Sequence, residues 1–302
     1  MEDVPEPSAD GVEVRIAATG MCRTDLHIVD GRFPEVVLPR ILGHEIAGEA
    51  EGLGPVLVLG AWGCGKCSRC AAGEEQLCRE CVNPGFELDG GFAERIVVPD
   101  AGRLVPLGDM DPVAGAPLAD AGLTSYRAAR RARPWLDGRA RAAVIGAGGL
   151  GQFAVQYLRQ FAPDARISVV ETSASKGDRA LVLGADDTTP PEEFEGSADV
   201  VLDVVGTDDS LMLAVRSVRP AGALILVGEA GGRIPYGIDS LPPETVLTTS
   251  FLGTREELEE VVALASSGRI TWEVEPLPLD LAPDALARLR AGDVPGRLVL
   301  VP

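Results

Sequence analysis

The segment Val144–Gly151, "VIGAGGLG", is the strongest indication of the fold in the central part of this 302-residue chain. It places glycines at 146, 148 and 151, between the apolar run Ala142–Ile145 and a helix-like stretch that opens at Leu150. Glycines in this spacing permit a tight turn and let the backbone approach a pyrophosphate, which the free N–H groups of the helix would bind. The spacing alone is a weak signal, but its position between a strand and a helix predicts a dinucleotide-binding βαβ unit.

An acidic residue follows this turn at the distance expected for such a unit. Glu171 closes the apolar run "RISVVE", 20 residues after Gly151. Its carboxylate would accept a hydrogen bond from the ribose 2′-OH of NAD and repel the 2′-phosphate of NADP, so NAD is predicted. NADP stays open, since four polar or basic side chains could help to hold its phosphate: Ser173, Ser175, Lys176 and Arg179.

The sequence around the turn continues as alternating strands and helices. Apolar strand-like runs recur at "RISVVE", "ADVVLDVVG", "ALILVGE" and "VLTTSFLG", with helical segments such as "KGDRALVLGAD" between them and a proline–glycine turn before "ALILVGE". This alternation predicts a parallel sheet with both faces covered, as in a doubly wound Rossmann domain. The residues expected at the cofactor are Gly146, Gly148, Gly149, Leu150, Gly151, Glu171, Val205 and Val227.

The two ends of the chain have a different character. The first third is rich in predicted strands, "GVEVRIAATG" and the pair within "FAERIVVPDAGRLVPLG". The last part reads as an amphipathic helix with a threonine cap, "TREELEEVVALASSGRI", followed by one more helix and a terminal strand in "DALARLRAGDVPGRLVLVP". A β-rich domain therefore precedes the α/β domain.

Four cysteines form the pattern C-x2-C-x2-C-x7-C at Cys64, Cys67, Cys70 and Cys78. Four thiolates can surround a zinc ion tetrahedrally with no open position, which is typical of a structural site. An iron–sulfur cluster is the rival interpretation, but the seven-residue gap and the lack of a proline after the last cysteine disfavour it. Cys81 is interpreted as a plain buried thiol rather than as a competing ligand.

A second cluster of chemically active residues lies in "TGMCRTDLHIVDG", Thr19–Gly31. It brings together a cysteine, a threonine, an aspartate and one of the chain's two histidines, His27; the other is His44. Such a stretch is either a surface loop or part of a metal site that moves protons.

Composition limits the classes of partner. The net charge of −19 without a basic stripe argues against nucleic acid and against anionic membranes. No apolar run reaches the length of a membrane span, and the acidic "MEDVPEPSAD" start is unlike a signal peptide. We therefore expect a cytoplasmic protein, in which six cysteines favour metal ligation over disulfides.

An ordered set of motifs resembles the zinc-dependent, medium-chain alcohol dehydrogenases. The motifs are "GMCRTDLH", "GHEIAGE", "WGCGKCSRCAAGEEQLC", "GGFAERIVVP", "APLADAGLTSYRA", "GAGGLG", "DVVG" and "GRLVLVP". The resemblance covers nearly the whole chain. It implies a shortened GroES-like β-barrel catalytic domain at 1–121 and 254–302, interrupted by a Rossmann NAD-binding domain at 122–253, with the active site between them.

The resemblance also implies roles for individual residues. Cys22, His44 and Asp120 would hold a catalytic zinc with an open fourth position, and the cysteine loop would hold a structural zinc. Glu45 would lie beside the catalytic metal. The zinc would lower the pKa of the alcohol, hydride would pass to the nicotinamide, and the proton would leave through Thr24 and then His27, while Asp25 would bond the loop backbone.

The implied function is reversible oxidation of an alcohol to an aldehyde or ketone with NAD, in a homodimer or homotetramer paired near "VLTTSFLG". One alternative is a superfamily-derived biosynthetic enzyme with reductase or redox-neutral chemistry, which the complete zinc-ligand set disfavours. Another is a non-catalytic NAD-binding scaffold, which would have no use for Thr24 and His27. Phe33, Phe86 and Leu118 suggest an apolar substrate site for medium or aromatic alcohols.

Three regions are shorter than the family pattern. The usual opening strand is missing, "EGLGPVLVLG" runs almost directly into the cysteine loop, and the stretch before "ADVVLDVVG" is reduced to "TTPPEEFEGS". The losses leave every candidate ligand in place. They predict an incompletely closed barrel, whose exposed edge a partner subunit could cover, or a cleft opened for a bulky substrate.

Overall fold

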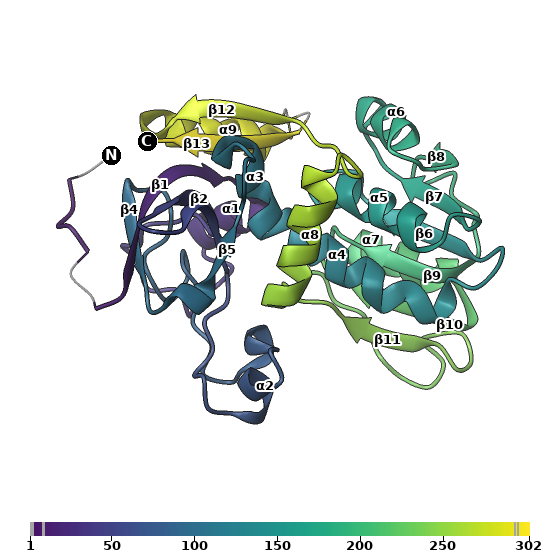
Figure 1. Cartoon of the computed structure of the whole chain (residues 1–302). Coiled ribbons are helices and arrows are strands. Elements are labelled where there is room, and N and C mark those ends of the chain that lie inside the picture. Colours follow the sequence, from purple (N-terminus) through teal and green to yellow (C-terminus); the bar gives the residue numbers. More distant parts are fainter. Residues whose placement is uncertain (1–2, 8–9, 293, 295) are drawn as a thin grey trace. The chain divides into compact units, whose positions relative to one another are not determined.

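The computed structural model describes residues 3–7, 10–292, 294 and 296–302. The chain forms two compact units, Met1–Leu123 with Leu252–Pro302, and Thr124–Phe251 (Figure 1). The sequence places the borders at 121/122 and 253/254, against 123/124 and 251/252 in the structure. Each unit has a β-sheet of its own and a separate core.

The sheet of the second unit is parallel throughout its described ladders, in the order β11-β10-β9-β6-β7-β8. Its strands are β6 (Arg141–Ile145), β7 (Arg166–Val170), β8 (Asp187–Thr189), β9 (Ala198–Asp203), β10 (Val218–Leu226) and β11 (Val246–Thr249). The chain runs outward from β6 to β7 and β8, then returns to β9 on the other side of β6. This is the doubly wound Rossmann topology with its switch point between β6 and β9.

Helices α5 (Gly151–Phe161), α6 (Ala174–Val182) and α7 (Asp208–Ser217) pack against this sheet. Every residue of β9 is buried, as expected for a strand covered on both faces. Thr207 caps α7 through a bond from the Ser210 N–H. One prediction was wrong: the proline–glycine segment is not a turn that precedes the strand but an irregularity inside β10, between Val218 and Ala223.

The sheet of the first unit follows the order β12-β13-β1-β2-β3-β5, with β4 also paired to β1. Its strands are β1 (Val12–Gly20), β2 (Glu45–Ala50), β3 (Gly54–Val58), β4 (Arg95–Val98), β5 (Leu104–Pro106), β12 (Val274–Pro278) and β13 (Arg297–Val301). The terminal strand β13 returns to pair with β1, as predicted. Over the described residues the path ends at β12 and β5 without a ladder that joins them, so the barrel is open.

The shortened "EGLGPVLVLG" stretch still forms a strand. It follows β2 after a three-residue turn, 51–53, and becomes β3 in an antiparallel hairpin. The "TTPPEEFEGS" stretch adds no helix after β8. Both of these shortened stretches therefore still lead into or out of a paired strand, β3 in one case and β8 in the other.

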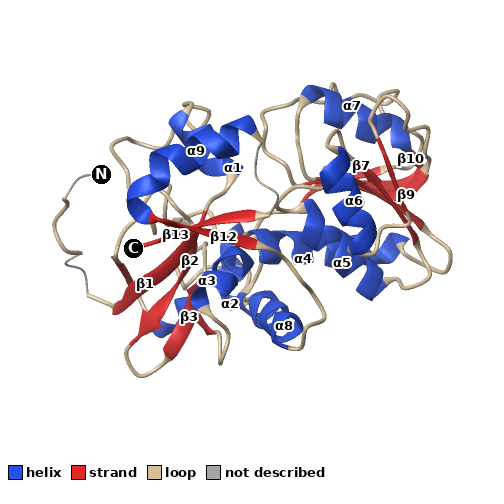
Figure 2. Cartoon of the chain, turned by 90° about the horizontal axis from the view of Figure 1, so that it is seen from above, coloured by secondary structure: helices blue, strands red, loops and turns tan. Residues whose placement is uncertain are grey.

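The helices of the first unit lie around its sheet. They are α1 (Arg23–Val29), α2 (Ser68–Ala71), α3 (Pro112–Gly115), α8 (Arg255–Ser266) and α9 (Ala282–Ala291), while α4 (Ala121–Ala132) begins in this unit and continues into the second. Short 3-10 turns are η1 (Glu75–Leu77), η2 (Ala101–Arg103), η3 (Ala116–Ala119), η4 (Arg133–Trp135) and η5 (Leu279–Leu281). Helix α1 lies beside α9 (Figure 2), and a small apolar core around Met21 and Leu298 joins this region to β13. No helix in the described ranges is both long and apolar enough to cross a membrane.

Candidate active site and metal centres

The stretch Thr19–Gly31 is the end of a strand and a short helix. Strand β1 ends at Gly20, Cys22 stands at the N-cap of α1, and Thr24 and His27 follow on the helix three residues apart. Residues three apart share one helix face. The helix therefore carries a thiol at its start and two proton-transfer candidates along one side.

Four buried side chains from separate elements meet at the beginning of β2. One ligand atom each from Cys22, His44, Glu45 and Asp120 lies within 4.8 Å of the others. His44 directly precedes β2, Glu45 is its first residue, and Asp120 follows η3. Nε2 of His44 is 3.5 Å from Oδ2 of Asp120. Thiolate, imidazole and carboxylate are the ligand types of zinc. Because burial of several acidic side chains is costly without a compensating charge, this group fits a bound cation.

Asp25 supports this group from behind His44. It is fully buried, and its Oδ1 lies 3.4 Å from Nδ1 of His44. Its two oxygens also accept from the backbone N–H groups of Cys22, at 2.9 Å, and Gly43, at 3.3 Å. The expected bonds to the backbone are present, and the carboxylate also lies beside Nδ1 of His44 while Nε2 of the ring faces Asp120.

Glu45 has a partner that the sequence did not reveal. It is fully buried and forms an ion pair with Arg297 of β13, which is itself buried. Burial raises the pKa of Glu45 to about 7, against the attraction of Arg297. Gly20 makes room for the carboxylate, since a Cβ there would come within 2.0 Å of Oε2 of Glu45. The only signal in the sequence is an arginine at the start of the apolar run "GRLVLVP".

Thr24 lies beside Cys22 of this group, and His27 follows three residues later on α1. The Cys22 thiol lies 3.5 Å from the Thr24 hydroxyl. His27 is half-buried, and its ring centroid is 6.5 Å from that of Phe33. Burial and then the positive charges of Arg32 and Arg23 lower the pKa of His27 below its ordinary value. A neutral imidazole near pH 7 is able to accept a proton.

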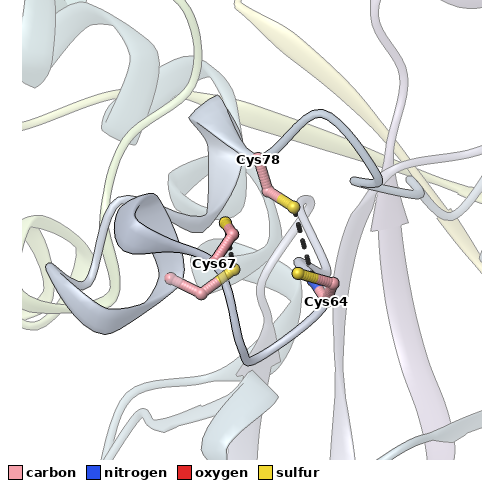
Figure 3. Close-up of side chains that lie close together, drawn as sticks. Cys64, Cys67 and Cys78 are labelled. Atoms are coloured by element: carbon pink, nitrogen blue, oxygen red, sulfur yellow. Dashed lines mark hydrogen bonds between the residues drawn. The ribbon is translucent and has the colours of Figure 1, made fainter.

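The four predicted cysteines of the second centre come together. Their sulfurs, from Cys64, Cys67, Cys70 and Cys78, lie within 4.8 Å of one another, in a loop that projects from the sheet of its own unit (Figure 1). Figure 3 shows the labelled side chains directed toward a common point. Backbone N–H groups of Cys64 and Glu80 donate to the Cys78 sulfur at 3.4 and 3.3 Å.

Backbone N–H groups favour the thiolate, the form that binds metal, at Cys64 and Cys67, whereas burial raises the pKa of Cys70 to about 11. A backbone N–H of Cys70 lowers the pKa of the Cys67 thiol to about 6. Gly63 lets the loop close, because a Cβ there would lie 2.6 Å from the Cys70 sulfur, and Gly65 takes a positive φ of 71°. Cys81 lies outside the four-cysteine group, and burial raises its pKa to about 11; the residue is only partly buried, not the fully buried thiol that the sequence predicts.

The glycine turn of the second unit has the geometry of a phosphate cradle. Gly146 has a φ of 96°, and a Cβ at Gly151 would lie 2.0 Å from the Gly146 oxygen, so the helix packs tightly on the strand. A Cβ at Gly148 would meet open space. Leu150 caps α5, with its carbonyl held by the Ser125 hydroxyl, and the Gly149 carbonyl accepts from Gln152.

The other predicted cofactor residues lie at the same carboxyl edge of the sheet. Glu171 follows β7, and its Oε2 accepts from the Ala147 N–H of the glycine turn at 2.7 Å. Val205 contacts Gly146, and the Val227 N–H donates to the Asp203 carbonyl. The buried carboxylate of Asp203, which the sequence did not single out, accepts from the N–H groups of Val205 and Gly206 and shapes this edge.

Comparison with known proteins agrees with this geometry. Residues 8–109 match the family model "Alcohol dehydrogenase GroES-like domain", and residues 149–267 match "Zinc-binding dehydrogenase". A D-arabinose 1-dehydrogenase (NADP(+)) of Saccharolobus solfataricus is 34% identical over 99% of this chain and 93% of its own. An NAD-dependent alcohol dehydrogenase of Sulfurisphaera tokodaii is 31% identical over 100% of this chain and 96% of its own.

The fold is similar to that of solved enzymes. The crystal structure of the alcohol dehydrogenase from Aeropyrum pernix superposes with a TM-score of 0.91 at 35% identity, and covers 100% of this chain and 96% of that one. A β-sheet unit with a donor set of cysteine, histidine and carboxylate and a Rossmann unit together define a nicotinamide-dependent dehydrogenase. The chain belongs to the medium-chain zinc alcohol dehydrogenases. It is an oxidoreductase that interconverts an alcohol and its carbonyl compound by hydride exchange with a nicotinamide dinucleotide.

Proposed function

We propose that this enzyme uses NAD and two zinc ions, one held for catalysis by Cys22, His44 and Asp120 and one held for structure by the four-cysteine loop. The observation that carries the proposal is the buried donor set, whose ligand atoms lie within 4.8 Å of one another. A zinc ion there would supply Lewis acidity, which lowers the pKa of a substrate alcohol and polarises a carbonyl.

The residues around this donor set have separate tasks. Asp25 holds the imidazole of His44, at 3.4 Å from its Nδ1. Glu45 is kept close by its ion pair with Arg297, so its second carboxylate oxygen stays beside the donor set. Both contacts keep charged side chains ordered at a site buried from water, where electrostatic interactions are strong.

Thr24 and His27 are proposed to move the proton. The Thr24 hydroxyl lies beside the Cys22 sulfur and would accept the proton that the alcohol loses. His27, three residues further along α1, would pass it to water. The lowered pKa of His27 keeps the imidazole neutral near pH 7, in the state that accepts a proton.

NAD is preferred over NADP on the evidence of Glu171. Its carboxylate lies at the glycine turn, where it meets the ribose of a bound dinucleotide in this fold. A negative charge at that point would repel the 2′-phosphate of NADP. The name of the Saccharolobus solfataricus relative specifies NADP, and steady-state kinetics with both cofactors distinguishes the two preferences.

The substrate is proposed to be a medium-sized apolar or aromatic alcohol. The Phe86 ring centroid is 5.5 Å from that of His44, and Phe33 packs edge-on against Phe86 at 5.8 Å. These rings make an apolar wall beside the donor set. Leu118 is fully buried in η3, so the two phenylalanines carry this argument.

A homodimer formed through β11 is proposed as the smallest assembly. This strand is the edge of the parallel sheet, and Tyr236, Ile238 and Val246 near it are 75%, 96% and 43% exposed. Open edges and large exposed apolar side chains favour pairing with a second chain. Light scattering coupled to size-exclusion chromatography measures the mass of the assembly.

A cytoplasmic location is also proposed. The six cysteines are unpaired, and the reducing cytoplasm keeps thiols in this state.

The decisive experiment combines metal content with turnover. Mass spectrometry of the metals in the purified enzyme is expected to give two zincs per chain, and NADH oxidation on a panel of aldehydes and ketones is expected to show turnover. One zinc per chain without turnover would rule out the proposed catalytic centre. Reduction of an enoyl substrate without aldehyde turnover would instead support a reductase of the same superfamily.

A further inference from the structure

Arg103 is a buried arginine beside the four-cysteine loop. It ends the short turn η2, and its carbonyl accepts from the Leu59 N–H at 2.9 Å, which fixes its backbone to the sheet. Only 8% of the residue is exposed. By contrast, Arg69 inside the loop pairs with Glu74 with 57% of its side chain exposed. A buried guanidinium is costly unless its surroundings supply negative charge.

The contacts of Arg103 tie together two parts of the loop. Its guanidinium donates to the carbonyl of Gly63 at 3.1 Å and forms an ion pair with Glu75. The same Glu75 oxygen accepts from the Gly63 N–H at 2.9 Å. Gly63 precedes Cys64, and Glu75 lies between Cys70 and Cys78. One side chain anchored in the sheet therefore holds the chain segments that carry the first and the last ligands.

The negative charge of the four-cysteine loop favours a cation at the position of Arg103. Four thiolates around a divalent ion carry a net charge of about −2, and Glu75 adds another negative charge. Burial lowers the pKa of Arg103. The negative charge of a nearby Cys70 thiolate acts in the opposite direction and favours the charged guanidinium. The nearest other carboxylate, Asp100, is 3.7 Å from Nε and largely exposed. Lys66 and Arg69 within the loop are exposed, so Arg103 is the buried cation beside the four cysteines.

We propose that Arg103 is a positioning residue of the four-cysteine site, which slows metal release by holding Gly63 and Glu75 and by compensating the thiolate charge. The inference rests on the proposed structural zinc. Removal of a partner from the outer shell of a metal site typically weakens metal binding by about 10–100-fold. We expect a similar acceleration of metal release when the guanidinium is lost.

The test measures metal release at each site separately. The zinc-loaded enzyme is mixed with excess EDTA and with iodoacetamide at a concentration high enough that metal release limits alkylation. Peptide mass spectrometry then follows alkylation of the four loop cysteines and, independently, of Cys22. Arg103→Met is expected to speed loop alkylation by about 10–100-fold while Cys22 alkylation keeps the wild-type rate.

Three further variants make the result specific. Arg103→Lys keeps the charge but lacks the planar fork, so its rate is expected between those of the wild type and Arg103→Met. Glu75→Gln removes the ion pair and is expected to speed release at the loop. Arg255→Met is the matched control, because Arg255 donates to the Leu104 carbonyl beside Arg103 and has no bond to the loop, so wild-type rates are expected.

Other outcomes overturn the proposal. Wild-type release rates in Arg103→Met would show that the guanidinium does not hold the metal. Equal acceleration at Cys22 would show general destabilisation of the unit instead. If Arg103→Met does not fold, the other two variants provide the test. Wild-type rates of metal release in both Arg103→Lys and Glu75→Gln would then overturn the proposal. Immediate alkylation of the wild-type loop without EDTA would instead refute the structural zinc itself.

Discussion

Oδ1 of Asp25 lies 3.4 Å from Nδ1 of His44, while Nε2 of the same imidazole faces Asp120 at 3.5 Å. The ring therefore lies between two carboxylates, Asp25 beside Nδ1 and the proposed zinc ligand Asp120 beside Nε2. Asp25 comes from α1, and His44 directly precedes β2. This relationship joins the two sequence motifs that each contain one of the chain's histidines.

Asp25→Asn is expected to weaken zinc binding at the catalytic centre by about 10–100-fold, because the amide no longer fixes the imidazole as a carboxylate does. Competition with a chelator measures the affinity, and turnover is expected to fall with it at limiting zinc. Asp30→Asn, at the exposed end of the same helix, is the control and is expected to keep wild-type affinity. Unchanged zinc affinity in Asp25→Asn would mean that the carboxylate serves only the backbone of Cys22 and Gly43.

The glycine turn allows a matched pair of substitutions. Gly148→Ala is expected to leave stability unchanged, because its Cβ meets open space, but to weaken NADH binding by filling the cradle. Gly151→Ala is expected to destabilise the fold by about 1–3 kcal/mol or more, because its Cβ would lie 2.0 Å from the Gly146 oxygen. Thermal unfolding and NADH fluorescence titration measure the two effects. Normal NADH affinity in Gly148→Ala would place the pyrophosphate elsewhere.

Much of this architecture could be predicted from local patterns. The glycine turn, Glu171 and the four cysteines are marked by spacing within short segments, so the sequence was enough to predict that they lie together. The strand that returns to the first sheet, β13, pairs with residues far away in the chain, and its prediction depended on the family resemblance. The prediction of a turn at the proline–glycine segment failed because the residues before and after it, Val218 and Ala223, both pair with β9. The segment therefore stays inside β10.

The partners of the candidate ligands were the part that could not be predicted. The Glu45–Arg297 ion pair joins residues 252 positions apart, and Arg103 reaches Gly63 from 40 positions away. Arginine is common in this chain, so nothing in the composition marks either residue. Only the fold shows which arginines are buried against carboxylates and which are exposed.

Glu171→Ala is expected to raise KM for NAD by about 10–100-fold, since a hydrogen bond from the ribose to a charged group is lost. KM for NADP is expected to change little or to fall, because the repulsion of the 2′-phosphate disappears. Steady-state kinetics with both cofactors gives the ratio. Lys176→Ala is the companion variant: a selective loss of NADP turnover there, with NADP preferred by the wild type, would contradict the proposed preference for NAD.

The role of His27 in proton transfer can be separated from any role in metal binding. His27→Gln is expected to keep two zincs per chain and to slow turnover by up to about 10²-fold, most strongly at low buffer concentration. Added imidazole buffer is expected to restore part of the rate, because a dissolved base can take the proton. Loss of zinc in this variant would show that His27 supports the metal centre instead.

The pH dependence of stability gives an independent measure of His27. Its pKa is lowered in the folded state by burial and by Arg32 and Arg23, so the unfolded chain binds a proton at a higher pH than the folded chain. Below the ordinary pKa of about 6.5, protonation therefore favours unfolding, and the loss of stability continues until the pH reaches the lower folded-state value. Denaturant unfolding at pH 7.5 and pH 5.5 is expected to show a larger loss of stability for the wild type than for His27→Gln. An equal loss of stability in the two proteins would mean that His27 has the same pKa in the folded and unfolded states. The surroundings of His27 on α1 would then not contribute to its neutral form at pH 7.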